Sequence, residues 1–163
     1  MTRVSFRPVE LPRDAERCIA FRKDSYMVSF GTDEAFYRDN GPNGERYLDF
    51  LSQRIALDPN YVVFALEHDN LIGQIELGPY RADDTIGYVN LYYVVPEARR
   101  RGIGKQLDAY ATSYLKSKGF AKARLSVSPT NVAAMTFYSR SGWRDLGPRP
   151  DAPNVHLMEK DLS

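Results

Sequence analysis

The sequence contains one cysteine, Cys18, among its 163 residues. A single thiol excludes a disulfide within the chain and is typical of proteins from a reducing compartment. No run of residues approaches the apolar length of a membrane-spanning helix, and the first residues lack the apolar segment of a secretory signal. We therefore expect a cytoplasmic protein.

The sequence also lacks an excess of charge of either sign. It has 22 lysines and arginines against 21 aspartates and glutamates, a formal net charge of +1. A chain so close to neutrality has no general attraction for nucleic acid or for an anionic membrane. Repeats and low-complexity tracts are missing too. The length fits a single domain over residues 1–163 that is large enough to bury a core of its own.

Histidine is scarce, with only His68 and His156 in the sequence. One falls in a predicted turn and the other in a predicted terminal strand, and neither has clustered partners. A metal site needs several ligands close together. We therefore predict that the protein binds no metal.

The most informative stretch is a predicted strand that turns into a helix. The β-rich residues 87–95 predict a strand that ends at Pro96, which cannot donate to a sheet ladder. Apolar residues three and four apart predict a helix over residues 103–118. Gly102 and Gly104 lack side chains at its start, so backbone N–H groups there could reach an anion, helped by the helix dipole.

Cationic side chains surround this turn. They are Arg99, Arg100, Arg101 and Lys105. A diphosphate would therefore meet N–H donors, the helix dipole and positive charge together. Two other interpretations stay open, namely a solvated arginine corner and a simple tight turn. Neither the P-loop nor the dinucleotide fingerprint fits, because Lys105 is followed by Gln106 and position 107 is leucine.

The turn residues and apolar patterns in the rest of the sequence predict a chain that alternates strands and helices. Strands are predicted at residues 4–9, 61–67, 71–77, 87–95, 123–127, from 143, and 155–159, helices at 12–27, 45–57, 103–118 and 129–141, and loops at 29–44 and 147–150.

The pattern Arg99-x-x-Gly102-x-Gly104 resembles the pyrophosphate-binding motif of the GNAT superfamily of acyl-CoA-dependent N-acyltransferases. A later run is similar to a second motif of that family, Asn-x-x-Ala-x-x-x-Tyr followed by glycine and an aromatic residue. Its residues here are Asn131, Ala134, Tyr138, Gly142 and Trp143. The two motifs span residues 88–145, and the predicted order of elements is also that of the family. The resemblance implies an α/β (α+β) GNAT fold, with a mixed, mostly antiparallel sheet of about seven strands flanked by four helices.

The resemblance also implies acetyl-CoA as cosubstrate. The residues it assigns to binding are Tyr92, Tyr93, Val94, Arg99, Arg100, Arg101, Gly102, Ile103, Gly104, Lys105 and Asn131. In the family the central strand splays from its neighbour, and its backbone groups pair with the pantetheine arm. Residues 92–94 would flank the thioester, and one N–H would polarise its carbonyl and stabilise the oxyanion. The alternative is an ordinary sheet ladder.

Tyr138 is implied by the resemblance to be the general acid toward the leaving thiolate. Asn131 lies seven residues before it, about two helical turns, so both would lie on one helix face. With a tyrosine pKa of about 10 and a thiol pKa of about 8.5, the proton transfer is uphill by roughly 2 kcal/mol, which is small beside the barrier. The alternative is a core aromatic residue beside Phe137.

The proton of the acceptor amine needs a base, because a lysine-like amine with a pKa of about 10.4 is protonated at neutral pH. Some family members carry an acid on the strand where this sequence has Ser126. Glu76, in the middle of an apolar strand, is the candidate by elimination. The alternatives are a chain of water molecules as the base, and a merely solvent-facing carboxylate at Glu76.

The acceptor is expected to be a primary amine of a small molecule or peptide. Five aromatic residues could line its pocket or belong to the core: Tyr26, Phe30, Phe36, Tyr37 and Tyr80. Direct transfer would leave no role for Cys18. We expect no nucleic-acid or membrane partner, and a homodimer stays open. A non-catalytic acyl-CoA sensor is the main alternative, and a weaker one is phosphate-backbone binding by Arg99, Arg100 and Arg101.

Overall fold

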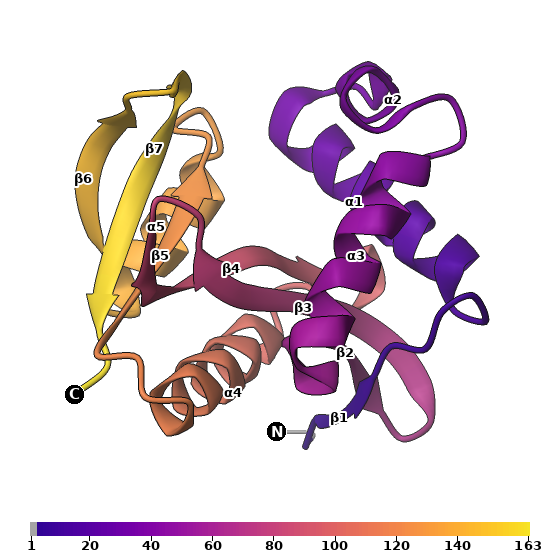
Figure 1. The fold of residues 1–163 in the computed structure, drawn as a ribbon, viewed down its shortest axis with the longest axis horizontal. Coiled ribbons are helices and arrows are strands. Elements are labelled where there is room, and N and C mark those ends of the chain that lie inside the picture. Colours follow the sequence, from indigo (N-terminus) through magenta and orange to yellow (C-terminus); the bar gives the residue numbers. More distant parts are fainter. Residues whose placement is uncertain (1–2) are drawn as a thin grey trace. The chain divides into compact units, whose positions relative to one another are not determined.

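A computed structural model describes residues 3–163 of the chain (Figure 1). The strands are β1 (Ser5–Pro8), β2 (Val62–Glu67), β3 (Asn70–Tyr80), β4 (Asp83–Val94), β5 (Lys122–Val127), β6 (Arg144–Arg149) and β7 (Ala152–Asp161). The helices are α1 (Ala15–Phe30), α2 (Glu34–Asn40), α3 (Glu45–Leu57), α4 (Ile103–Ser117) and α5 (Val132–Arg140), with short 3-10 turns η1 (Pro59–Tyr61) and η2 (Pro96–Ala98).

Within residues 3–163 the strands form one sheet of seven, in the order β1-β2-β3-β4-β5-β7-β6. The β1–β2, β2–β3, β5–β7 and β6–β7 ladders are antiparallel, whereas β4 and β5 run parallel. The parallel pair is joined by a crossover through α4, as parallel strands require. The mixed, mostly antiparallel sheet that the family resemblance predicts is therefore confirmed.

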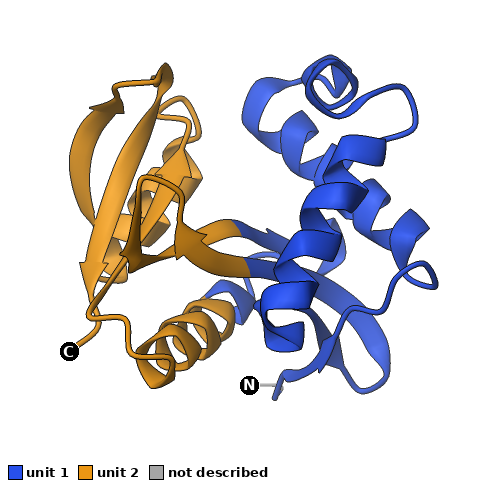
Figure 2. Cartoon of the chain, viewed as in Figure 1, with its two compact units in different colours: residues 1–76, 91–104 blue, residues 77–90, 105–163 orange. Residues whose placement is uncertain are grey.

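The chain divides into two compact units (Figure 2). Unit 1 comprises Met1–Glu76 and Leu91–Gly104, and unit 2 comprises Leu77–Asn90 and Lys105–Ser163. Unit 1 has an aromatic-rich core, because the apolar faces of its helices meet the buried residues of β2 and β4. The core residues are Val9, Cys18, Phe21, Phe36, Tyr47, Leu51, Val62, Phe64, Leu91 and Tyr93.

Unit 2 has a sheet with one buried and one half-exposed face. Along β5, Ala123, Leu125 and Val127 are buried, and the residues between them are not. Helix α4 buries a stripe of residues four apart, Leu107, Ala111 and Leu115, as the sequence pattern predicted.

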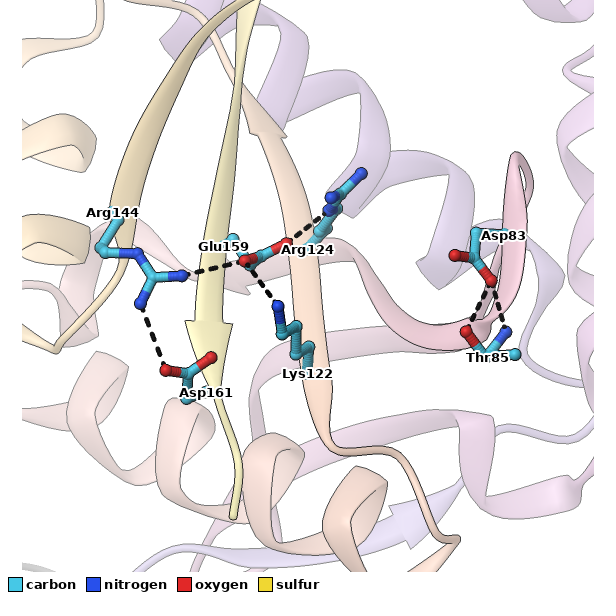
Figure 3. A network of polar contacts seen from close by, with 7 residues as sticks. All are labelled: Asp83, Thr85, Lys122, Arg124, Arg144, Glu159 and Asp161. Atoms are coloured by element: carbon cyan, nitrogen blue, oxygen red, sulfur yellow. Dashed lines mark hydrogen bonds and ion pairs between the residues drawn. The ribbon is translucent and has the colours of Figure 1, made fainter.

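A buried carboxylate, that of Glu159 on β7, joins three strands of unit 2 (Figure 3). It pairs with Arg124 on β5 at 2.8 Å and with Arg144 on β6 at 2.9 Å. Lys122 of β5 lies 3.6 Å from it. A buried charge needs such partners to be tolerated, and these hold β5, β6 and β7 in register.

Two segments differ from the sequence-based prediction. Residues 29–44 were expected to form a loop, but they contain α2, so five α-helices rather than four lie in residues 3–163. The cause is tertiary: Phe36 is fully buried, with its ring 5.7 Å from Tyr26 and 6.0 Å from Tyr47. The expected loop at 147–150 was also wrong in part, because Gly147–Arg149 completes β6, where Pro148 lies opposite His156.

Candidate active site

The backbone between β4 and α4 turns sharply before the helix begins. Arg100 and Gly102 both have left-handed backbone angles, with φ of 64° and 79°. Glycine adopts this conformation without strain, which accounts for Gly102. Ile103 is buried and anchors the start of α4, while Gly102 and Gly104 on either side are only half-buried. The first turn of a 15-residue helix therefore begins between two residues without side chains.

Two arginines of this turn, Arg99 and Arg101, bind other groups of the protein. Arg99 donates from Nε to the carbonyl oxygen of Val94 at 2.8 Å and from Nη2 to Asp24 at 2.9 Å. Arg101 donates to Glu67 at 2.5 Å. Arg99 and Arg101 therefore anchor the turn to other parts of the chain. Anion contacts by backbone N–H groups remain compatible with this arrangement, since they do not need the Arg99 or Arg101 guanidinium.

Asp24 of α1 fastens the end of β4. Its Oδ2 accepts a hydrogen bond from the Tyr93 hydroxyl at 2.6 Å as well as the one from Arg99. The Tyr93 ring is buried and lies 4.8 Å from the ring of Phe21. Burial, together with the Asp24 carboxylate, raises the pKa of Tyr93, so its hydroxyl stays a donor. Asp24 could not be recognised from the sequence, since nothing local marks a partner 69 residues away.

Gly73 of β3 allows an unusually close approach to the same part of β4. A Cβ atom built on Gly73 would lie 2.3 Å from the carbonyl oxygen of Tyr93. The backbone of Gly73 is not left-handed, so the need for glycine here is purely steric. Next to it, the N–H of Val95 donates to the carbonyl of Ile72 at 2.9 Å. In the sequence, the signal for this close approach is a lone glycine inside a strand pattern.

The register between β4 and β5 is short. It joins Gly87 to Ala123, Tyr88 to Arg124 and Val89 to Leu125. Strand β5 goes on through Ser126 and Val127, which pair with β7. Strand β4 goes on to Val94. The β4–β5 ladder therefore joins three residues of each strand, and both strands continue beyond it.

Helix α5 carries the second motif. Asn131 is its N-cap, with Oδ1 accepting from the N–H of Ala134 at 3.2 Å, so Asn131 lies just outside the helix that we expected to contain it. The ring of Tyr138 packs 5.4 Å from Phe137 and 6.2 Å from Trp143. Burial, together with the nearby charge of Asp108, raises the pKa of Tyr138. Tyr138 is thus a packed aromatic residue whose hydroxyl stays protonated.

Glu76 is fully buried, so the expectation of a solvent-facing carboxylate is wrong. Its Oε2 accepts from the Tyr47 hydroxyl at 2.5 Å and from Gln74 Nε2 at 2.9 Å. Among residues 3–163, Oε1 of Glu76 has no hydrogen-bond partner. Burial raises the pKa of Glu76 against the opposing charge of Arg22. One open carboxylate oxygen of raised basicity is chemically suited to accept a proton.

Four of the five predicted pocket aromatics do lie together. The Tyr26 ring contacts Phe30 at 5.8 Å, and the Phe36 ring contacts Tyr26 and Tyr37 at 5.7 and 5.3 Å. Phe36 is core, whereas Phe30 and Tyr37 are exposed. Tyr80 belongs to unit 2, where it stacks on Tyr88.

Other reactive side chains are occupied or buried. Cys18 is fully buried, and burial, with the charge of Glu76, raises the pKa of its thiol, which makes it a poor nucleophile. His156 lies 3.0 Å from Asp145. Residues 3–163 contain no cluster of three His, Cys, Asp or Glu side chains suited to a metal. None of the helices in the same range is long and apolar enough to span a membrane.

Comparison with known proteins gives one family. The sequence profile of the "Acetyltransferase (GNAT) family" matches residues 22–143. A mycothiol acetyltransferase from Streptomyces griseus is 27% identical over 140 residues, 86% of this chain and 43% of that protein. N-alpha-acetyltransferase 30 from Schizosaccharomyces pombe is 30% identical over 87 residues, 52% of this chain and 58% of that protein. The chain thus spans about half the length of these relatives.

Solved structures agree on the fold. The paia N-acetyltransferase of Thermoplasma acidophilum, crystallised in complex with coenzyme A, superimposes with a TM-score of 0.78 at 23% identity. The match covers 98% of this chain and 99% of that one. At this level of identity the likeness shows a shared fold.

Proposed function

The chain belongs to the acetyltransferase (GNAT) family, and we propose that it transfers an acetyl group from acetyl-CoA directly to a primary amine of a small molecule or peptide. The observation that carries the proposal is the start of α4, where Gly102 and Gly104, which have no side chains, flank Ile103. We also propose that residues 1–163 act as one domain, because the family match runs through both units.

The residues present fit coenzyme A. The N–H groups at Gly102, Ile103 and Gly104, with the helix dipole, would bind the diphosphate. Arg100 and Lys105 add positive charge at the same turn, and both are exposed. Arg99 and Arg101 support this site by holding the turn in place through Val94, Asp24 and Glu67.

The end of β4 would hold the thioester. Tyr92, Tyr93 and Val94 lie beyond the last residue that pairs with β5. A backbone N–H in this stretch would polarise the thioester carbonyl and bind the oxygen as negative charge develops on it. Asp24 and Gly73 act as positioning residues here, since both fix the backbone around Tyr93.

Tyr138 would assist departure of the sulfur as the carbon–sulfur bond breaks and the carbon–nitrogen bond forms. Its pKa is raised above the usual value of 10, which makes full proton transfer to a thiolate more costly than roughly 2 kcal/mol. A hydrogen bond from the Tyr138 hydroxyl to the developing thiolate is therefore the better description of its role. Asn131, as the cap of α5, would orient this helix toward the pantetheine arm.

The amine proton needs an acceptor. Glu76 offers a buried carboxylate with an open Oε1 and a raised pKa, and a chain of water molecules is the alternative. Cys18 takes no part, because its buried thiol of raised pKa is a poor nucleophile, and no acyl-enzyme is formed.

The test is an acceptor panel. Purified protein is mixed with acetyl-CoA and a set of primary amines, and free thiol is followed over time. We expect thiol release that depends on the amine, together with acetylated amine in the product. Measurable coenzyme A binding without acceptor-dependent thiol release would instead favour a non-catalytic acyl-CoA sensor. A protein without a general base would lose acetyl transfer but keep its diphosphate-binding site.

A further inference from the structure

Three polar side chains form a hydrogen-bonded triangle in the core of unit 1. Tyr47 of α3 donates its hydroxyl proton to Oε2 of Glu76 at 2.5 Å. Gln74, two residues before Glu76 on β3, donates from Nε2 to the same oxygen at 2.9 Å and to the Tyr47 hydroxyl at 3.0 Å. All three residues are buried. The donors of the triangle therefore hold one carboxylate oxygen, Oε2, from two sides.

The two remaining oxygens of the triangle are open. Among residues 3–163, Oε1 of Glu76 and Oε1 of Gln74 are buried and make no hydrogen bond. A buried acceptor without a partner destabilises a fold, whereas apolar side chains of the same shape could fill the space without that loss. A role for the open carboxylate oxygen in proton transfer explains why the sequence keeps a polar group there.

The triangle lies beside the end of β4, within the same unit. Gln74 directly follows Gly73, whose Cβ would lie 2.3 Å from the carbonyl oxygen of Tyr93. Gln74 is also opposite Phe64 in the β2–β3 ladder. The ring of Phe21 lies 6.0 Å from that of Phe64 and 4.8 Å from that of Tyr93. The tyrosine of the triangle belongs to the same buried cluster. The carboxylate and the thioester-binding stretch of the proposed function therefore share one core.

Several groups determine how basic this carboxylate is. Burial raises the pKa of Glu76, and the charges of Arg22 on α1 and Arg54 on α3 act against burial. The two hydrogen bonds of the triangle also favour the ionised form. The thiol of Cys18 on α1 interacts with Glu76 as well, but it stays neutral because burial raises its pKa. Loss of either hydrogen bond should therefore raise the pKa of Glu76 further.

We propose that Tyr47 and Gln74 are positioning residues for the proton acceptor, and that they hold Oε2 of Glu76 so that Oε1 takes the proton of the acceptor amine. The N–H bond of the amine breaks as an O–H bond forms at Oε1, and the electron pair left on nitrogen forms the bond to the acetyl carbon. The carboxyl group becomes neutral, while Tyr47 and Gln74 keep their own protons. The inference rests on the proposed function, because it needs an amine that must lose a proton.

The pH dependence of kcat/KM tests the proposal, with thiol release from acetyl-CoA and a primary amine of the acceptor panel as the readout. Wild-type activity should fall as pH drops through the pKa of Glu76, and the residual activity of Glu76→Gln should lack this acid limb. Tyr47→Phe and Gln74→Met each remove one donor to the carboxylate. We expect each to move the limb to higher pH by about one unit, as loss of a hydrogen bond to a charged group would.

A second measurement follows the carboxyl group itself. Infrared difference titration of the protein without coenzyme A, compared with Glu76→Gln, gives the pH at which Glu76 is half protonated. Tyr47→Phe should raise this midpoint by the same amount as the acid limb. Tyr61→Phe is the matched control, because Tyr61 is another buried tyrosine of unit 1, and it should leave both the limb and the midpoint in place.

The outcomes separate this inference from the proposed function. A triangle with a structural role alone predicts lower stability in Tyr47→Phe with an unmoved acid limb. That result, or an acid limb retained in Glu76→Gln, overturns the inference and leaves the transferase standing. Thiol release from no acceptor in the wild type overturns the proposed function, and this inference with it.

Discussion

Gly73→Ala is the substitution whose effect follows most directly from the geometry. The added Cβ would lie 2.3 Å from the Tyr93 carbonyl oxygen, whereas such contacts are essentially never under 3.0 Å. The two backbones must therefore separate by at least about 0.7 Å, the difference between these distances. Strand β4 cannot move cheaply here, because Tyr93 is tied to Asp24 and Val94 to Arg99.

The expected cost has two parts. Forcing extra volume into a packed site typically costs about 1–3 kcal/mol of stability. A shift approaching 1 Å in a residue that flanks the reacting group can cost roughly 100-fold in rate. We therefore expect Gly73→Ala to lose about 2 kcal/mol in the free energy of unfolding. Its turnover per folded molecule should fall about 10- to 100-fold.

Denaturant unfolding measures the first quantity, and thiol release from acetyl-CoA measures the second. Gly87→Ala is the matched control, because Gly87 is also a buried strand glycine without a left-handed φ. The atoms nearest to its Cβ would be side-chain atoms of Leu115 and Phe120, at 3.1 to 3.3 Å. If Gly73→Ala were as stable and as active as Gly87→Ala, the close approach of β3 to Tyr93 would not be what positions the site.

Two further predictions concern the proton-handling groups. Tyr138→Phe should lower turnover while coenzyme A affinity, measured by calorimetry, stays near the wild-type value. Tyr114→Phe in α4 is the control, and unchanged turnover in Tyr138→Phe would refute the role of the hydroxyl. Because burial raises the pKa of Glu76, its protonated form stabilises the fold below the ordinary value of 4.5, and this stability is lost as pH rises through the folded-state pKa. Glu76→Gln cannot titrate, so its unfolding free energy should fall less between pH 4.5 and pH 8, and parallel pH profiles would contradict the assignment.

Much of the fold could be predicted because its signals are local. Helix α3 has the predicted bounds, and α4 begins at Ile103 as the apolar spacing indicated. Helix α2 could not be predicted, because glycine, asparagine and proline around it read as a loop. The burial of Phe36 against residues of two other helices stabilises it. The same limit applies to Gly147–Arg149, whose pairing with β7 overrides its turn-like composition.

The candidate active site likewise has features that the sequence predicts and features that it does not. The glycine turn at Gly102 is a sequence-local feature, and the structure places it at the start of α4 as expected. The contacts of Asp24 cross 69 and 75 residues, so no pattern along the chain could indicate them. The burial of Glu76 was misjudged because an isolated strand carboxylate is normally exposed. Its burial depends on Tyr47, which lies 29 residues earlier.

The central claim is that backbone N–H groups at the start of α4 bind the diphosphate of acetyl-CoA. The most direct test is the affinity of Gly104→Val for coenzyme A, measured by calorimetry beside Ala109→Val, which places the same side chain on an exposed position of the same helix. The account predicts wild-type affinity for Ala109→Val and no detectable binding for a correctly folded Gly104→Val. Wild-type affinity in folded Gly104→Val would contradict it.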